Sequence, residues 1–147
     1  MTAGFFARAV VTAIAAGQGI MPVFIDLNGT HATNPLWTGH ARFHVVQQVF
    51  TLLPAAVIEV ALLWYPGAAF RARFYVAALL TATSLAGFAV AVCARPLYGG
   101  TLHDPNGMRP VRLRIGSWLV VFDLNVPVVL LAAGLLLGAV LLFGLAA

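Results

Sequence analysis

Four long runs of apolar residues dominate the chain, and short polar stretches rich in proline, glycine and arginine separate them. A helix that crosses the hydrocarbon core of a bilayer needs about 20 largely apolar residues, and each run has that length. The runs cover about residues 5–25, 43–64, 74–94 and 117–143. The pattern predicts an all-α integral membrane four-helix bundle, with a single transmembrane domain over residues 1–147.

Four spans bring both termini to one side of the membrane, together with the short loop after the second span. We call this side the terminal face. The two longer connections, residues 26–40 and 95–116, lie on the opposite side, the loop face. Five of the eight arginines are expected at the loop face and three at the terminal face. The positive-inside rule therefore favours a cytoplasmic loop face. Pro127 offers a break in the long fourth run.

Composition supports lipid as the solvent for most of the chain. Hydrophobic residues make up 62% and charged residues 8% of the sequence, whereas soluble domains carry about 25% charged residues. All basic residues are arginine, and no basic stripe alternates with aromatics, which argues against a nucleic-acid partner. The single cysteine, Cys93, excludes an intramolecular disulfide. This arginine-rich, lysine-free composition is typical of GC-rich bacteria, so we expect a bacterial inner-membrane protein.

A histidine-rich stretch joins the first two runs. Thr38 suits the N-cap of the second helix, because its hydroxyl can accept a hydrogen bond from a free N–H in the first turn. His40 and His44 then share one helix face, and Gln47 extends that face into the bilayer. A polar stripe in lipid is costly unless it faces a partner or a cavity. His31 lies only nine residues before His40, so we expect it close by.

An intramembrane carboxylate is expected in the fourth run. Asp123 lies six residues into that run, which corresponds to a depth of about 9 Å below the loop face. An ionisable residue at this depth marks a functional site by default. The alternative is a hydrogen bond to Asn, Gln or Thr that serves only helix packing.

These features define one candidate site, in which the histidines and Asp26 converge above a cavity whose floor includes Gln47 and Asp123. The candidate catalytic residues are His31, His40, His44, Asp26 and Asp123. The candidate substrate-binding residues are Gln47, Asn34, Trp37, Arg42 and Asn125. The site either needs no cofactor or holds a divalent transition metal, for which the candidate ligands are His31, His40, His44 and His103.

Two further acids have structural interpretations. The segment His103-Asp104-Pro105-Asn106-Gly107 has the signature of a type I turn, so Asp104 is expected to shape the turn while His103 leans over the site. Glu59 follows His44 by fifteen residues, or about 22 Å along a helix. Glu59 therefore belongs to the half of the bundle near the terminal face, where we expect an interhelical lock or a snorkelling acid.

Three short segments resemble a known membrane family. Phe24-Ile25-Asp26-Leu27 closes the first run, Val49-Phe50-Thr51-Leu52-Leu53-Pro54 lies in the second, and Asp123, Asn125 and Pro127 interrupt the fourth. In this arrangement the chain resembles the EXPERA-domain four-helix membrane proteins, the family of the sigma-2 receptor and the emopamil-binding sterol isomerase. The resemblance implies a lipophilic substrate or ligand in a pocket within the bundle, with Asp26 and Asp123 as pocket acids. The histidine-rich stretch is similar to loops of uncharacterised small bacterial membrane proteins.

Three functions remain open at this point. The first is a membrane enzyme that acts on a lipophilic small molecule by His/Asp acid–base chemistry, as an isomerase or cyclase does. The second is a metal-dependent membrane enzyme with Zn, Fe or Cu on the histidines. The third is a non-enzymatic protein, either one that binds a lipophilic ligand or membrane lipid or an accessory subunit.

The spacing of two glycines in the fourth run concerns assembly. Gly134 and Gly138 form a small-xxx-small pair, which permits close contact between helices. The pair predicts a homodimer or tight packing within the bundle through that helix face.

Overall fold

The computed structural model describes residues 2–104, 107 and 109–146. Its helices are α1 (Ala3–Ile25), α2 (Gly39–Trp64), α3 (Phe70–Tyr98) and α4 (Asn125–Ala146), and its strands are β1 (Val111–Ile115) and β2 (Trp118–Phe122). All four helices are long and apolar enough to cross a membrane. The predicted class, an all-α membrane bundle, is confirmed.

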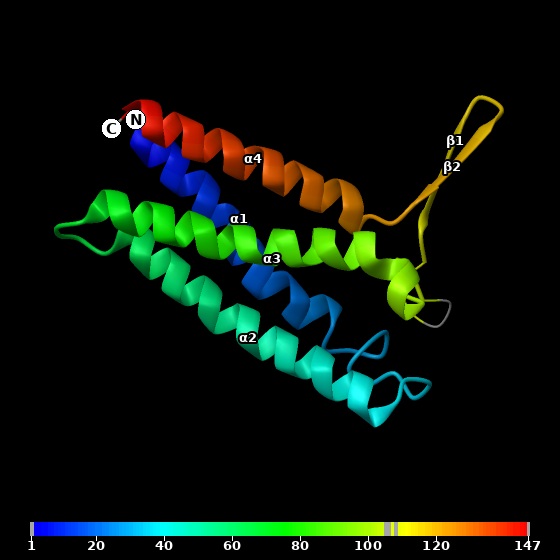
Figure 1. Ribbon diagram of the computed structural model, residues 1–147. Coiled ribbons are helices and arrows are strands. Elements are labelled where there is room, and N and C mark those ends of the chain that lie inside the picture. Colours follow the sequence, from blue (N-terminus) through cyan, green and yellow to red (C-terminus); the bar gives the residue numbers. More distant parts are fainter. Residues whose placement is uncertain (1, 105–106, 108, 147) are drawn as a thin grey trace.

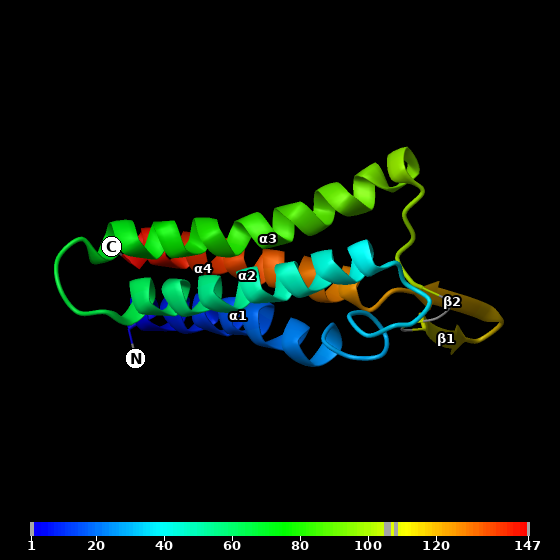
Figure 2. The same cartoon turned by 90° about the horizontal axis from the view of Figure 1, so that it is seen from below.

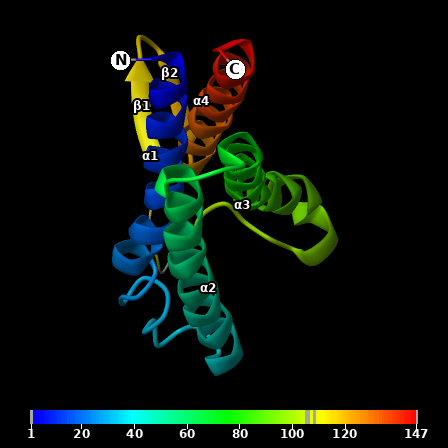
Figure 3. The same cartoon turned by 90° about the vertical axis from the view of Figure 1, so that its left-hand side faces the viewer.

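The four helices run side by side, with α1 packed against each of the other three (Figure 1). The start of α1 and the end of α4 lie at one end of the bundle, beside the α2–α3 loop. Toward the other end α3 diverges from its neighbours (Figures 2 and 3). The α1–α2 loop and the β1–β2 hairpin lie at that second end, so the two faces expected from the sequence are present.

The buried core lies in the half of the bundle near the terminal face. Phe74 of α3 stacks on Phe143 of α4 with ring centroids 3.7 Å apart, and both rings are almost fully buried. The guanidinium of Arg8 lies 4.2 Å from the ring centroid of Trp64, an attractive cation–π contact. This packing holds the helices together at one end and leaves the loop face free to carry polar groups.

Glu59 forms the interhelical lock that its position predicts. Its side chain is only 4% exposed, and its carboxylate accepts a hydrogen bond from the Thr81 hydroxyl at 2.5 Å. The Thr81 carbonyl in turn accepts from the Gln18 side-chain amide at 3.2 Å. These contacts link α2, α3 and α1 where water cannot compete, and a buried polar group without a partner would be costly there.

The fourth predicted span begins too early. Residues 118–122 form β2, which pairs with β1 in an antiparallel hairpin, and α4 starts only at Asn125. Gly116 has a φ of 60°, as required at the first central position of the two-residue turn that joins such strands. Arg112 and Arg114 alternate with apolar residues, a period of two that favours a strand. Asp123 therefore precedes the helix, and the depth calculated from a helix that begins at residue 117 does not apply to it.

Close helix contact occurs at a different glycine from the predicted pair. A Cβ built on Gly19 of α1 would lie 2.5 Å from the Ala56 Cβ of α2, closer than real carbon contacts. A Cβ at Gly134 or Gly138 would meet nothing within 4 Å. Tight packing within the bundle through Gly134 and Gly138 is therefore wrong, whereas an interface with a second chain stays a prediction.

Candidate functional site

A cavity of about 230 Å³ opens at the loop face, where three separate segments meet. The α1–α2 loop, the α3–β1 loop and the β2–α4 junction each supply part of its wall. Its lining residues are His31, Trp37, Thr101, Leu102, His103, Asp104, Asp123 and Asn125. Two imidazoles and two carboxylates thus share one small space.

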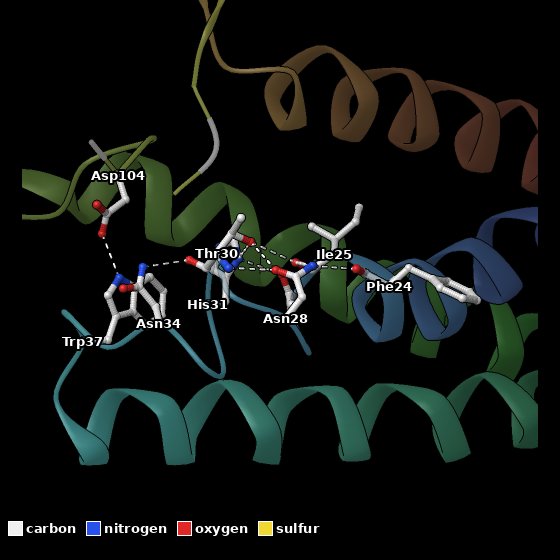
Figure 4. A network of polar contacts seen from close by, with 9 residues as sticks. Phe24, Ile25, Asn28, Thr30, His31, Asn34, Trp37 and Asp104 are labelled. Carbon is white, nitrogen blue, oxygen red and sulfur yellow. Dashed lines mark hydrogen bonds and ion pairs between the residues drawn. The ribbon is translucent and has the colours of Figure 1, made fainter. Parts of the chain in front are cut away.

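Local hydrogen bonds fold the α1–α2 loop into a defined shape (Figure 4). The Asn28 side-chain amide donates to the carbonyls of Phe24 and Ile25 at 2.7 and 2.9 Å, and thereby caps the end of α1. The Asn34 side chain is 1% exposed. It donates to the Thr30 carbonyl at 3.3 Å and accepts from the backbone N–H two residues later at 3.0 Å. The loop is therefore a rigid support for His31, and Asn34 has a structural role there.

The same network determines which nitrogen of neutral His31 carries the proton. The Asn28 side-chain oxygen accepts from the Thr30 N–H at 2.8 Å and lies 2.7 Å from the Thr30 hydroxyl. Both the Asn28 side-chain oxygen and the Ile25 carbonyl oxygen can only accept a hydrogen bond, so the Thr30 hydroxyl donates its one proton to one of them. Its lone pair then faces His31 Nδ1 at 2.8 Å, so Nδ1 is the protonated nitrogen. Nε2 remains as the basic nitrogen.

Asp26 supports this orientation of His31. Its Oδ1 lies 3.8 Å from His31 Nδ1, and the side chains are 21% and 23% exposed, respectively. Burial raises the pKa of the Asp26 carboxyl, and the charge of His31 lowers it in part. A base whose second nitrogen is oriented by an acid is the general arrangement of an activated proton acceptor. The predicted pairing of His31 with Asp26 is therefore present.

Trp37 connects two walls of the cavity. Its indole Nε1–H donates to Asp104 Oδ2 at 2.9 Å, and its ring meets the His31 ring edge-on at 5.1 Å (Figure 4). The Gly107 N–H donates to the Asp104 carbonyl at 3.1 Å, which closes the predicted turn. Pro105 and Asn106, the two central residues of that turn, lie outside the described residues.

Asp123 and Asn125 supply the third wall. The Asn125 backbone N–H donates to Asp123 Oδ1 at 2.9 Å, so the carboxylate satisfies a free donor at the start of α4. Asp123 is thus both a helix-capping residue and a cavity acid. A second hollow of about 490 Å³ shares His103 and Asp104 with the cavity and is otherwise bordered by Arg109, Pro110 and Arg112.

His40 and His44 form a separate pair on α2. Their Nε2 atoms are 3.0 Å apart, and His44 Nδ1 lies 3.3 Å from Gln47 Oε1. Both histidines are exposed, and neither they nor Gln47 line the cavity. Thr38 caps this helix as predicted, with its hydroxyl accepting from the Ala41 N–H at 3.2 Å. The single convergent cluster expected from the sequence is therefore two groups.

The predicted metal ligands are divided between these two groups, with His31 and His103 at the cavity and His40 and His44 on α2. Within residues 2–104, 107 and 109–146, no three His, Cys, Asp or Glu side chains are arranged to hold a metal ion. The pair His40 and His44 offers two nitrogen ligands, fewer than the three or four of known zinc sites. Arg42, expected to bind substrate, is half-buried on α2 and does not line the cavity.

Three contributors to the site are not evident as such in the sequence. The pattern around Asp104 indicates only a turn, and Asn28 and Thr30 lie in no motif typical of a catalytic or ligand-binding site. The signal for Asn28 and Thr30 is local, because Asn and Thr side chains often bond to backbone groups two residues away. The role of Asp104 depends on its tertiary contact with Trp37.

No protein-family model, curated protein or solved structure matches this chain, so the case for its function rests on the cavity itself.

Proposed function

We propose that the protein is a membrane enzyme that moves protons on a lipophilic small molecule, in the manner of a double-bond isomerase or cyclase. The observation that carries the proposal is the loop-face cavity, in which an oriented His31 faces a space shared with His103, Asp104 and Asp123. The cavity lies at the end of an apolar bundle, so a substrate dissolved in the membrane reaches it with little desolvation. The resemblance to the EXPERA-domain proteins suggests the same substrate class.

The proposed reaction needs a proton donor, a proton acceptor and protection from water. A cavity acid, for which Asp123 is our candidate, adds a proton to one carbon of a carbon–carbon double bond. His31 Nε2 removes a proton from a neighbouring carbon, so the double bond shifts and no electrons enter or leave. The positive charge that develops between these steps lies near the carboxylates and the face of Trp37, both of which stabilise a cation. Solvent then restores the two protonation states.

Deuterium incorporation tests this proposal whichever lipid is the substrate. The full chain in lipid nanodiscs is incubated in D₂O with a total lipid extract of bacterial membranes, and the lipids are analysed by mass spectrometry. A proton-transfer enzyme places solvent deuterium on carbon in one lipid class, in proportion to time and enzyme. Lipid that binds and is recovered without deuterium would instead support the ligand-binding alternative and contradict the enzyme.

The raised pKa of Asp26 predicts a pH-dependent stability. The folded chain holds the Asp26 proton more tightly than the unfolded chain does, so stability falls as the pH rises from about 3.8, the ordinary value, through the folded value. Asp26→Asn removes this titration. We expect the variant to be at least as thermally stable as wild type at neutral pH, with the difference vanishing below the ordinary pKa of aspartate. A variant that is less stable than wild type at neutral pH would contradict the prediction.

The proposed setting is the inner membrane of a bacterium, with a homodimer formed through α4. The exposed Gly134 and Gly138 leave a face where a second helix can approach closely. Gly138→Leu should convert the dimer to a monomer in analytical ultracentrifugation of detergent-solubilised protein. Gly87→Leu is the matched control, because its Cβ also meets nothing within 4 Å. Equal association of both variants with wild type would contradict a dimer through this face.

A further inference from the structure

The β1–β2 hairpin has one wholly apolar side. Neighbouring residues of a strand point to opposite sides, and the register pairs Ile115 with Trp118. One side therefore carries three apolar pairs, Val111 with Phe122, Leu113 with Val120, and Ile115 with Trp118. The other side carries both strand arginines, Arg112 opposite Val121 and Arg114 opposite Leu119. The hairpin is amphipathic.

The apolar side is exposed, although the hairpin lies outside the four membrane-spanning helices. Trp118 is 76% exposed, Ile115 64% and Leu113 48%. Exposed apolar residues on the helices are accounted for by lipid, but those of the hairpin need a separate explanation. A contiguous exposed apolar patch usually marks an interaction surface.

The direction of the hairpin indicates what covers it. It projects sideways from the end of the bundle, across the direction in which the helices run (Figures 1 and 3). Transmembrane helices are tilted by only about 20° from the bilayer normal on average. A segment that projects sideways at the end of such a bundle runs along the membrane surface.

The charge of the segment matches an anionic surface. Residues 109–122 contain Arg109, Arg112 and Arg114 and no acidic residue. Arg109 and Arg112 border the hollow of about 490 Å³ that His103 and Asp104 also line, so two guanidinium groups and one carboxylate lie at the base of the hairpin. Guanidinium binds phosphate oxygens through paired hydrogen bonds, and Trp118 is of the residue type enriched at membrane interfaces.

We infer that the hairpin lies in the interfacial layer of the bilayer at the loop face, with its apolar side against the acyl chains and its arginines on the phosphates of anionic phospholipids. The hairpin is thus an interaction surface for the protein's own membrane. This inference needs only the membrane-spanning bundle and is independent of the proposed reaction.

Two equally exposed positions on opposite sides test the orientation. Ile115 and Leu119 are 64% and 63% exposed, so a difference between them in a membrane reports which side meets lipid. Ile115→Cys and Leu119→Cys are made separately in a Cys93→Ala background and labelled with the fluorophore NBD. The full chain is reconstituted in vesicles of phosphatidylcholine and phosphatidylglycerol that contain acyl-chain quencher lipids. Leu113→Cys provides a second probe of the apolar side.

We expect strong quenching and blue-shifted emission at residues 115 and 113, and water-like emission at residue 119. Arg112→Gln and Arg114→Gln should each lower the ratio of membrane-bound to free hairpin by about fivefold in these vesicles. Vesicles of pure phosphatidylcholine, which lack the anionic lipid, should also lower the ratio of membrane-bound to free hairpin. Equal quenching on both sides, or none on either, would overturn the inference. So would emission at residue 115 that reverts when the protein is diluted in lipid, since a second copy would then cover that side.

Discussion

His31→Gln should lower the rate of deuterium incorporation by about 100-fold or more, because a positioned general base contributes roughly 10²–10⁴ to the rate of a proton transfer. Glutamine keeps a polar side chain of similar reach but has no nitrogen that can accept a proton. The Nδ1 side of His31 is held by Thr30 at 2.8 Å and lies near Asp26, so the loss is confined to the basic Nε2. The measurement is the initial rate of deuterium transfer to lipid in nanodiscs.

The matched control is His40→Gln. His40 is another histidine of the loop-face region, but it pairs with His44 on α2 and does not line the cavity. We expect the His40 variant to keep the wild-type rate within a few fold. A large loss in the His40 variant with full activity in the His31 variant would move the site to the exposed pair and contradict the proposed mechanism. Helix content by circular dichroism shows that both variants are folded.

Gly19→Leu should destabilise the bundle by about 1–3 kcal/mol or more, the range for overpacking a filled interior. Even the first added carbon would lie 2.5 Å from the Ala56 Cβ and 3.3 Å from the Leu52 carbonyl oxygen. Neither neighbour is the flexible end of a side chain, so α1 and α2 must separate. The measurement is unfolding by increasing fractions of denaturing detergent in mixed micelles.

Gly17→Leu is the control for that experiment. Gly17 lies two residues earlier on the same helix, and a Cβ there would meet nothing within 4 Å. Both substitutions replace a glycine of α1 with the same apolar side chain, so helix propensity changes alike, and the variants differ in whether the new side chain meets α2. Equal stability of the two variants would mean that α1 and α2 do not approach closely at Gly19.

Part of the candidate site follows from the sequence, and part does not. The approach of His31 to Asp26 is predictable, because a short loop begins at Asp26 and holds both residues. Asp123, Asn125 and Trp37 are also predicted near the site, and each of them lines the cavity. Placing His31 with the α2 histidines is wrong, because loop length limits separation but does not determine direction. The turns made by the loop's asparagine and threonine side chains carry His31 toward the α3–β1 loop instead.

The two small-residue pairs illustrate the same limit for packing. Ala15 and Gly19 in α1 have the same spacing as Gly134 and Gly138 in α4, and the sequence alone does not rank them. In the structure the first pair is buried, whereas the second is exposed. Small residues permit a close approach, but which helix takes the place beside them depends on the arrangement of the whole bundle.

The amino-acid sequence by itself determined the four membrane helices, the approximate ends of the first three and the N-cap at Thr38. These features are local, because lipid forces each apolar run to satisfy its own backbone hydrogen bonds. Only the tertiary structure decided that residues 118–122 leave the helix and pair with residues 111–115. Residues 118–122 are all apolar, so their hydropathy fits a strand and a helix equally, and the pairing with β1 decides between them. The cavity also depends on the tertiary structure. Its walls come from three segments that meet only when all four helices have packed.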